Sequence, residues 1–153
     1  MKKVGSVILG LFVVMLLTGC LGSKTLSCET TSDSDGLKAT QQYEFKYSGE
    51  KMSTAKITLK MEVEDVDNYD TYESILDSSF KEQLGLEDVD GIEVKTASKK
   101  PVYTITIDMD FKKLKDNSKL DELGLSITED DLELSIDELQ KQIEDSGLTC
   151  KVK

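Results

Sequence analysis

Three cysteines are the side chains of this 153-residue chain best suited to covalent chemistry, and they stand at positions 20, 28 and 150. A cysteine can be acylated, can ligate a metal or can join a second cysteine in a disulfide. The chain has no histidine and no arginine, so all 19 of its basic residues are lysines. Histidine is the usual general base and the commonest metal ligand. The cysteines therefore point to acylation or cross-linking rather than to histidine-dependent catalysis.

Cys20 ends a segment that has the layout of an export signal. Lys2 and Lys3 precede an uncharged, apolar run over residues 4–17, and a basic start followed by a short apolar run is typical of a signal peptide. The alternative, a membrane-spanning helix, needs about 20 apolar residues. The four residues that end the segment resemble the lipobox of bacterial lipoproteins, which is an apolar residue, two small residues and a cysteine: Leu17, Thr18, Gly19 and Cys20.

This resemblance implies that a peptidase cleaves the chain before Cys20 and that the Cys20 thiol carries a diacylglycerol. We therefore expect a lipoprotein signal peptide over 1–19, a lipid-anchored tether over 20–27 and a single domain over 28–153. Two acyl chains on one residue, such as palmitate, give the stable anchoring that a single chain does not. At ~3.3 Å per extended residue, the tether keeps the domain within about 25 Å of the lipid headgroups. The expected location is the cell membrane, facing outside the cytoplasm.

If Cys20 carries lipid, Cys28 and Cys150 remain as a pair in an exported protein, where disulfides form and persist. We predict that these two cysteines form a disulfide that closes nearly the whole mature domain. In the chain-entropy model, a loop of ~100 residues stabilises the folded state by about 4.7 kcal/mol. The sequence leaves one alternative open, which is a pair of buried free thiols.

The composition is that of one globular domain, and its negative charge disfavours some classes of binding partner. A chain of 17.0 kDa with 38% hydrophobic and 32% charged residues can bury a single modest core. Loss of residues 1–19 leaves 17 lysines against 30 acidic residues, a charge of −13. Binding to nucleic acid and to anionic lipid surfaces both require clustered cations. We therefore expect no nucleic-acid partner and no attachment to lipid through the protein surface.

Two runs in which apolar and polar residues alternate lie between residues 37 and 63, on either side of Gly49, and they predict a β-hairpin. Their apolar faces coincide only if paired residue numbers add to an even value, which implies an odd-length loop such as 49–51. A sum of 100 gives four such pairs: Tyr43 with Ile57 and Phe45 with Ala55 on the core side, and Glu44 with Lys56 and Lys38 with Glu62 on the outer side. The opposite charges of the outer pairs support this register.

A helical period follows over residues 69–84, before Gly85, and six apolar residues predict its buried stripe: Tyr69, Tyr72, Ile75, Leu76, Phe80 and Leu84. A second hairpin is predicted over 92–109, with Pro101 at the start of its second strand. One or two short helices are expected between residues 112 and 134. Ser135 and Glu138 then predict a capping box. The helix that they begin leads through Gly147 to a final strand with Cys150.

The predicted fold is therefore α+β: a mostly antiparallel sheet of about five to six strands, with two to three helices packed on one face. The other face of this sheet consists of threonine, lysine, glutamate and glutamine, and it is left to solvent or to a binding partner.

Other patterns that could carry chemistry have ordinary explanations. Three Ser-x-x-Lys matches begin at Ser48, Ser53 and Ser78, but the companion motifs of serine–lysine enzymes are missing and we attribute the matches to chance. A calcium loop read from Asp65 lacks the required glycine and the closing glutamate. This acidic run fits the start of a helix, where carboxylates favour the helix dipole. We expect no metal and no cofactor.

Several features together resemble small lipoproteins of Gram-positive, low-GC bacteria, similar to the YehR-like domain of unknown function. They are the lipobox at Cys20, the cysteine in "LSCETT", the strands of alternating Lys, Thr and Glu, and the helix that leads to "SGLTCKVK". The resemblance implies a compact α+β domain on the outer face of a membrane. It implies no activity, so no functional residue is taken from it.

We expect a non-enzymatic binding or accessory module, a monomer tethered at the membrane near an unknown membrane-proximal protein or envelope ligand. The short tether, the acidic domain and the lack of catalytic motifs favour this function. The alternative is a carboxylate-dependent cell-envelope hydrolase, which requires a cleft with two facing acidic residues.

Overall fold

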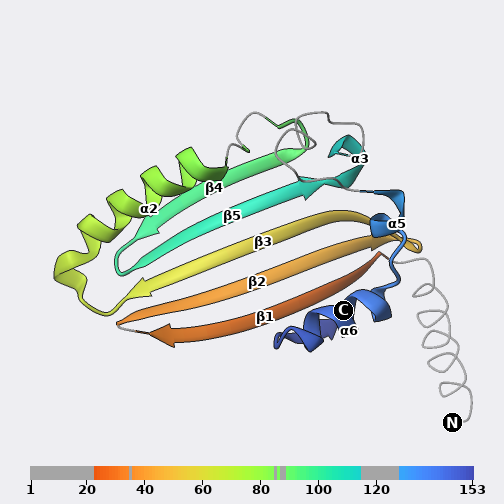
Figure 1. Ribbon diagram of the computed structural model, residues 1–153, viewed down its shortest axis with the longest axis horizontal. Coiled ribbons are helices and arrows are strands. Elements are labelled where there is room, and N and C mark those ends of the chain that lie inside the picture. The colour runs from red at the N-terminus through yellow and green to blue at the C-terminus, as the bar shows by residue number, and fades with distance from the viewer. Residues whose placement is uncertain (1–22, 35, 85, 87–88, 115–127) are drawn as a thin grey trace, which may run out of the picture.

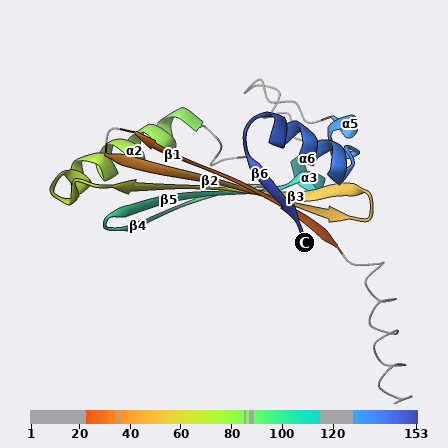
Figure 2. The ribbon, with the colours of Figure 1, turned by 90° about the horizontal axis from the view of Figure 1, so that it is seen from below.

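One six-stranded antiparallel sheet dominates the computed structural model, which describes residues 23–34, 36–84, 86, 89–114 and 128–153, with the backbone alone for 79–84. The strands lie in the order β4-β5-β3-β2-β1-β6, in which Figure 1 labels β4 to β1 and Figure 2 labels β6. Their bounds are β1 Lys24–Ser34, β2 Leu37–Ser48, β3 Lys51–Val63, β4 Ile92–Lys99, β5 Val102–Asp110 and β6 Thr149–Val152. The predicted α+β class with a mostly antiparallel sheet is confirmed.

Four α-helices lie on one face of the sheet in the part of the chain that the structure describes (Figure 2). Two are long, α2 (Tyr69–Leu84) and α6 (Ile136–Asp145). The other two, α3 (Phe111–Leu114) and α5 (Glu129–Leu132), have four residues each. A short 3₁₀ helix, η2 (Val66–Asn68), precedes α2. The helices are thus more numerous than predicted, but half of them are single turns, so the sheet makes up most of the fold.

The predicted register of the β2–β3 hairpin is confirmed at all four predicted pairs. The predicted loop is wrong, because β2 ends at Ser48 and β3 begins at Lys51, which leaves two loop residues. A register shift between Lys46 and Tyr47 reconciles the two results. It leaves Ser53 as an extra residue in β3, and the Ser53 hydroxyl donates a hydrogen bond to the Lys46 carbonyl oxygen at 2.9 Å. This β-bulge changes the pairing by one residue, as an additional loop residue would.

The helix-covered face of the sheet carries the core, which consists of three clusters of buried residues. The first lies beneath α3, α5 and α6: Tyr47, Met52, Ala55, Leu86, Val89, Phe111 and Leu114. The second lies where α2 begins: Met61, Val63, Tyr69, Tyr103 and Ile105. The third lies beneath α6 and joins the first and last strands: Leu26, Cys28 and Cys150. Six of these fifteen residues come from the alternating positions that the sequence predicts to face inward, and they are Tyr47, Ala55, Met61, Val63, Tyr103 and Ile105.

The two ends of the domain are joined by the disulfide. β6 pairs with β1 so that Cys150 lies directly opposite Cys28, and their sulfur atoms are bonded at 2.02 Å. Thr25 and Lys153 exchange backbone hydrogen bonds of 3.0 and 2.8 Å beside it. The predicted pairing of these two cysteines is thus present. β1 begins at Lys24, so residues 24–27, which the sequence analysis assigned to the tether, belong to the sheet.

Helix α2 packs on the sheet through fewer apolar residues than predicted. Tyr69 is 2% exposed and Leu76 is partly buried against the same cluster, but Tyr72 and Ile75 are 43% and 55% exposed. The predicted stripe is therefore wrong at these two positions, while Phe80 and Leu84 have side chains outside the described set. At ~100° per residue, position i+7 lies within ~20° of position i around the helix, whereas i+3 is displaced by ~60° and i+6 by ~120°. Tyr72 and Ile75 therefore lie progressively further from a narrow contact centred on Tyr69 and Leu76.

Polar contacts complete the attachment of α2. The Tyr69 hydroxyl donates to the Val102 carbonyl oxygen at 2.9 Å and lies 2.8 Å from the Ser98 hydroxyl. The Tyr103 hydroxyl donates to the Asp77 carboxylate at 3.1 Å. Burial and this hydrogen bond raise the pKa of Tyr103. Two tyrosines thus fix the helix to the β4–β5 hairpin.

Replacing Tyr69 by phenylalanine is expected to lower the free energy of unfolding by about 1 kcal/mol, because it removes the two part-buried hydrogen bonds of the buried hydroxyl to the Val102 carbonyl and to Ser98. Tyr72→Phe is the matched control on the same helix, and its exposed ring predicts a change within about 0.5 kcal/mol. Urea denaturation followed by circular dichroism measures both. Equal effects of the two variants would contradict this packing of α2.

Candidate functional site

The sheet face opposite the helices is polar and bare in the described part of the chain. Its side chains come from the residues that alternate with the core positions. In β1 and β2 these are Ser27, Glu29, Thr31, Asp33, Lys38, Thr40, Gln42, Glu44 and Lys46, and in β3 and β5 they are Thr54, Lys56, Thr58, Lys60, Glu62, Thr104, Thr106, Asp108 and Asp110. We call this surface the bare face. Its strand alternation confirms the polar face that the sequence predicts.

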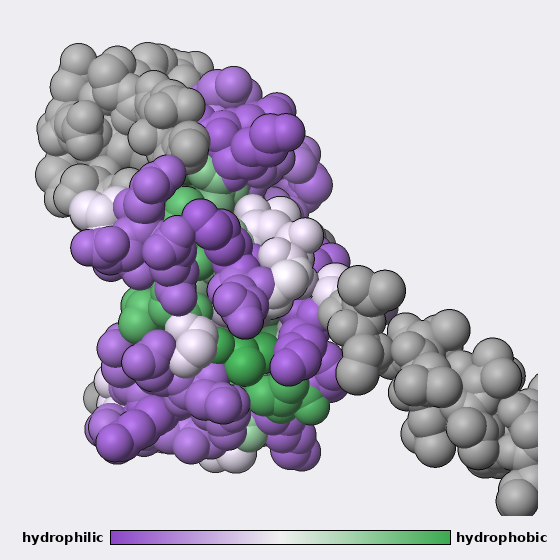
Figure 3. All heavy atoms as spheres, turned by 90° about the vertical axis from the view of Figure 1, so that its right-hand side faces the viewer, coloured by the Kyte–Doolittle hydropathy of each residue, from purple (hydrophilic) through white to green (hydrophobic). Residues whose placement is uncertain are grey.

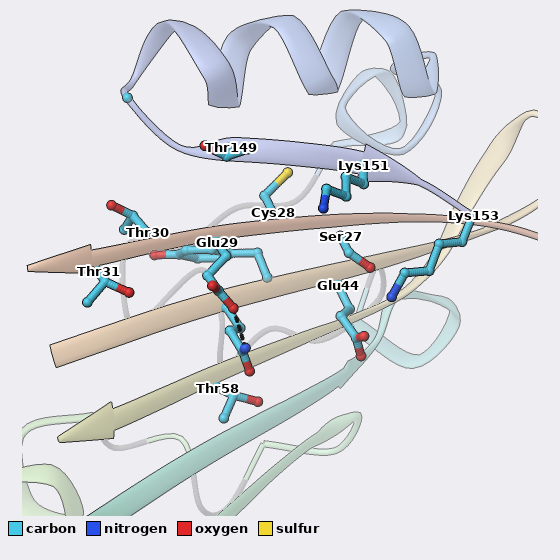
Figure 4. A pocket seen from close by; sticks show the side chains of 13 residues that line it. Ser27, Cys28, Glu29, Thr30, Thr31, Glu44, Thr58, Thr149, Lys151 and Lys153 are labelled. Carbon is cyan, nitrogen blue, oxygen red and sulfur yellow. Dashed lines mark hydrogen bonds between the residues drawn. The ribbon is translucent and has the colours of Figure 1, made fainter. Parts of the chain in front are cut away.

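A shallow hollow of about 640 Å³ lies on the bare face where β6, β1 and β2 meet (Figure 4). Its lining consists of nine polar residues of the bare face, together with Cys28, Thr30, Tyr43 and Gly147; the nine are Ser27, Glu29, Thr31, Gln42, Glu44, Thr58, Thr149, Lys151 and Lys153. Figure 4 shows their charged ends directed over the strands rather than into the core. The hollow is therefore a surface that can contact a polar ligand from one side.

One cross-strand row crosses this hollow and carries opposite charges. Ser27 pairs with Lys151 of β6 on one side and with Glu44 of β2 on the other. The Ser27 hydroxyl oxygen is buried and has no hydrogen-bond partner. Lys151, Lys153 and Glu44 make no ion pair or side-chain hydrogen bond within the described residues. A cationic group and an anionic group thus flank an unsatisfied hydroxyl.

The neighbouring row is already paired internally. The Gln42 side-chain amide donates to the Glu29 carboxylate, and this is the contact drawn in Figure 4. Thr149 and Thr58 stand at the two sides of this pair in the register. Among the described residues, the unpaired charges of the hollow are therefore Lys151 and Glu44 of the row through Ser27, together with Lys153 next to that row.

A second hollow of about 430 Å³ lies further across the bare face, toward β4 and β5. Several of its charges are paired: the Lys56 ammonium lies 3.3 Å from the Asp108 carboxylate, and Glu93 lies 2.9 Å from Lys95, which stands outside the lining. The hydrogen bond to Glu93 raises the pKa of Lys95. Glu44, which the two hollows share, and Lys46 also line this second hollow and make no ion pair among the described residues.

The residues that the sequence singled out for lipid attachment, Cys20 and the lipobox residues Leu17, Thr18 and Gly19, lie outside the described residues. The expectations for them remain predictions. Where the chain is described, no helix has the length and apolar character needed to cross a membrane.

Two of the three Ser-x-x-Lys matches, those that begin at Ser48 and Ser53, form no serine–lysine pair in the part of the chain that the structure describes. Ser53 donates to the Lys46 carbonyl, and Lys56 is held by Asp108 instead. Lys51 lies 2.6 Å from Glu133. The Ser78 hydroxyl donates to the helix backbone at Ser74, and the Lys81 side chain lies outside the described set. The expectation that these matches arise by chance agrees with the contacts present.

The acidic run from Asp65 begins a helix, as its composition predicts. The Asp65 carboxylate accepts hydrogen bonds from the Asp67 backbone amide at 3.2 Å and from the Asn68 side-chain amide at 2.7 Å. Within the described residues, no group of three or more acidic or cysteine side chains could hold a metal ion. The carboxylate of Asp65 thus serves as a helix cap.

The hydrolase alternative requires two carboxylates on opposite sides of a bound substrate. Glu29 and Glu44 are the carboxylates in the larger hollow, and they rise from one sheet face on neighbouring strands. Glu29 is exposed and is held by the Gln42 amide. The arrangement therefore offers one-sided contact with a ligand.

The sequence analysis missed Lys151 and Lys153 as members of a site. The signal that could have found them is the predicted disulfide, because Cys150 opposite Cys28 in antiparallel strands places Lys151 opposite Ser27. The lysines join the bare face only because β6 extends the sheet beside β1.

The fold and the bare face define a small α+β domain with one sheet face covered by helices and the other open to ligands. No protein-family model matches the chain, and no curated protein is significantly similar to it. The fold is similar to the NMR structure of a protein from Streptococcus pneumoniae TIGR4, with a TM-score of 0.51. The match covers 85% of this chain and 86% of that chain at 18% sequence identity. At this identity the likeness concerns the fold alone.

Proposed function

We propose that this chain is a lipid-anchored lipoprotein of the cell membrane, facing outside the cytoplasm and similar to the YehR-like lipoproteins. Its domain acts as a non-enzymatic binding or accessory module for an envelope ligand or a membrane-proximal protein. The observation that carries the proposal is the bare face, which presents free lysine and glutamate side chains around a hollow of about 640 Å³. The helices that pack on the other face supply the core and leave this one available.

The position of the strand ends supports an arrangement in which the domain lies close to the lipid. β1 begins at Lys24, only four residues after the expected acylation site, and the β6 end lies beside it. Four extended residues span about 13 Å. Seen from the side where β1 begins, the described surface is mainly hydrophilic (Figure 3). Such a surface favours water over the hydrocarbon core, so the acyl chains alone would hold the domain at the membrane.

Site-specific photocrosslinking in cells that produce the full chain tests this function. p-Benzoylphenylalanine replaces Thr31, which is exposed at the hollow, or Gln142, which is exposed on α6 as the matched control. A binding role for the bare face predicts one discrete adduct at position 31 that is absent at position 142. Adducts of equal yield at both positions, or none at position 31, would contradict a binding role for this face.

A further inference from the structure

The hollow on the bare face holds opposite charges that are not used by the fold. Within the described residues, Lys151 and Glu44 make no ion pair and no side-chain hydrogen bond. Other lysines of the bare face, such as Lys56 and Lys95, are paired with carboxylates. Lys151 and Glu44, like Lys38, Lys46 and Lys60 of the bare face, have no ion-pair partner among the described residues and can therefore contact a ligand of both charges.

The spacing of the row sets the size of that ligand. Lys151, Ser27 and Glu44 lie on three successive strands in direct register. Adjacent strands are ~4.8 Å apart, so the backbones that carry the two charges are about 10 Å apart. The lysine side chain is long and flexible, so its ammonium can move toward the glutamate and narrow this gap. The space left between the Lys151 ammonium and the Glu44 carboxylate then fits a ligand whose own two charged groups are a few ångströms apart.

Ser27 provides a third contact at the centre of the row. Its hydroxyl oxygen is buried and has no partner, although buried polar groups are normally hydrogen-bonded. A hydroxyl can donate one hydrogen bond and accept others. A ligand carboxylate beside Lys151 can accept the proton of the Ser27 hydroxyl only after the side chains that cover the hydroxyl move aside, and the contact would then satisfy this group.

The residue types around the hollow favour a zwitterion over some other ligand classes. Sugars and quaternary ammonium groups are commonly bound against aromatic faces, and Tyr43, which lines the hollow, belongs by its strand position to the core side. Phosphate recognition is favoured by the fork of arginine, and the chain has none. A small ligand with one carboxylate and one primary ammonium group matches the opposite charges of the row through Ser27.

We propose that this hollow binds a zwitterion, an α-amino acid or a short peptide with free ends, through Lys151 and Ser27 at its carboxylate and Glu44 at its ammonium group. The inference rests on the proposed function, in which the bare face is the binding surface. Lys153, which also lines the hollow, adds positive charge on the carboxylate side.

Saturation-transfer NMR on the full mature lipoprotein in lipid nanodiscs tests the ligand class with four probes. They are alanine, alanyl-alanine, N-acetylalanine (carboxylate only) and alanine amide (ammonium only). We expect alanine or alanyl-alanine to bind and both blocked probes to bind at least ~10-fold more weakly, because each loses a charge-assisted contact. The comparison of alanine with alanyl-alanine distinguishes an amino acid from a peptide.

Variants of the protein locate the binding. Lys151→Met and Glu44→Gln are each expected to weaken binding of the zwitterionic probe by at least ~10-fold. The matched control is Lys38→Met with Glu62→Gln, an exposed pair of the same types at the other end of the bare face, and it should leave binding unchanged.

Three results would overturn the inference: no binding of either zwitterion, equal binding of a blocked probe, or an equal loss in the Lys38 and Glu62 control. If the zwitterions fail while Thr31 still yields its discrete adduct in cells, the ligand class is wrong and the proposed function stands. If Thr31 also yields no adduct, the binding role of the bare face fails as well.

Discussion

Replacing Cys20 by serine is expected to abolish incorporation of fatty acid into the protein and to remove it from the detergent phase of a Triton X-114 partition. The reason is that a hydroxyl cannot take the place of the thiol that receives the diacylglycerol. The buried methylene groups of its acyl chains contribute ~0.8 kcal/mol each to membrane binding. Because two chains are lost together, the change in membrane affinity is the largest that we predict for any substitution.

Metabolic labelling with an alkyne analogue of palmitate measures this effect directly. The double variant Cys28→Ser with Cys150→Ser is the matched control, because it removes two thiols and retains Cys20. The control should label as the wild type does. Label that persists in the Cys20→Ser variant, or that disappears from the control, would place the acyl chain elsewhere.

Loss of the Cys28–Cys150 disulfide is expected to lower the free energy of unfolding by about 2–5 kcal/mol. The bond joins residues 122 apart, so its removal frees nearly the whole described domain in the unfolded state. β6 has only four residues and lies at the edge of the sheet, where β1 is its sole neighbour. Thermal unfolding of the Cys28→Ser, Cys150→Ser variant should therefore begin about 10 °C below that of the wild type.

Circular dichroism under non-reducing conditions measures the melting temperature, and dithiothreitol added to the wild type should reproduce most of the loss. Cys20→Ser is the control, since Cys20 lies outside the domain expected to fold. A melting temperature unchanged by both the double variant and the reductant would show that the bond contributes nothing to stability.

The register of the β2–β3 hairpin could be predicted because the numbers of paired residues must add to an even value if the apolar faces are to coincide. A shift of one residue would move Tyr43 and Ile57 to the solvent side, so only an even sum keeps the apolar faces together. The loop length could not be predicted with equal success, because the bulge at Ser53 supplies the same parity in another way. A three-residue loop and a two-residue loop with a bulge give the same pairing of β2 with β3, so the alternation in the sequence cannot distinguish them.

The burial of α2 was harder to predict than its existence. Tyr72 and Ile75 occur at helical spacing, but the helix contacts the sheet through Tyr69 and Leu76, with Asp77 bonded to Tyr103. Apolar spacing indicates which residues share a face, and tertiary contacts decide how wide the buried stripe becomes. The capping box at the start of α6 was predictable, because Ser135 and Glu138 bond only within the helix.

The candidate site depends on long-range pairing that no local pattern contains. Alternation predicts that Ser27 and Glu44 lie on the polar face, but it does not bring Lys151 to them. That step requires β6 to pair with β1, and the disulfide is the feature of the sequence that implies it. The proposed membrane location, by contrast, rests on the sequence of residues 1–20 and is independent of the fold.

The most direct test of the account is the intact mass of the native protein, extracted from membranes and kept unreduced. The account predicts residues 20–153 with a diacylglyceryl group on Cys20 and two hydrogens fewer than the free dithiol, a mass that an alkylating reagent leaves unchanged. A full-length, lipid-free chain with three thiols open to alkylation would contradict it.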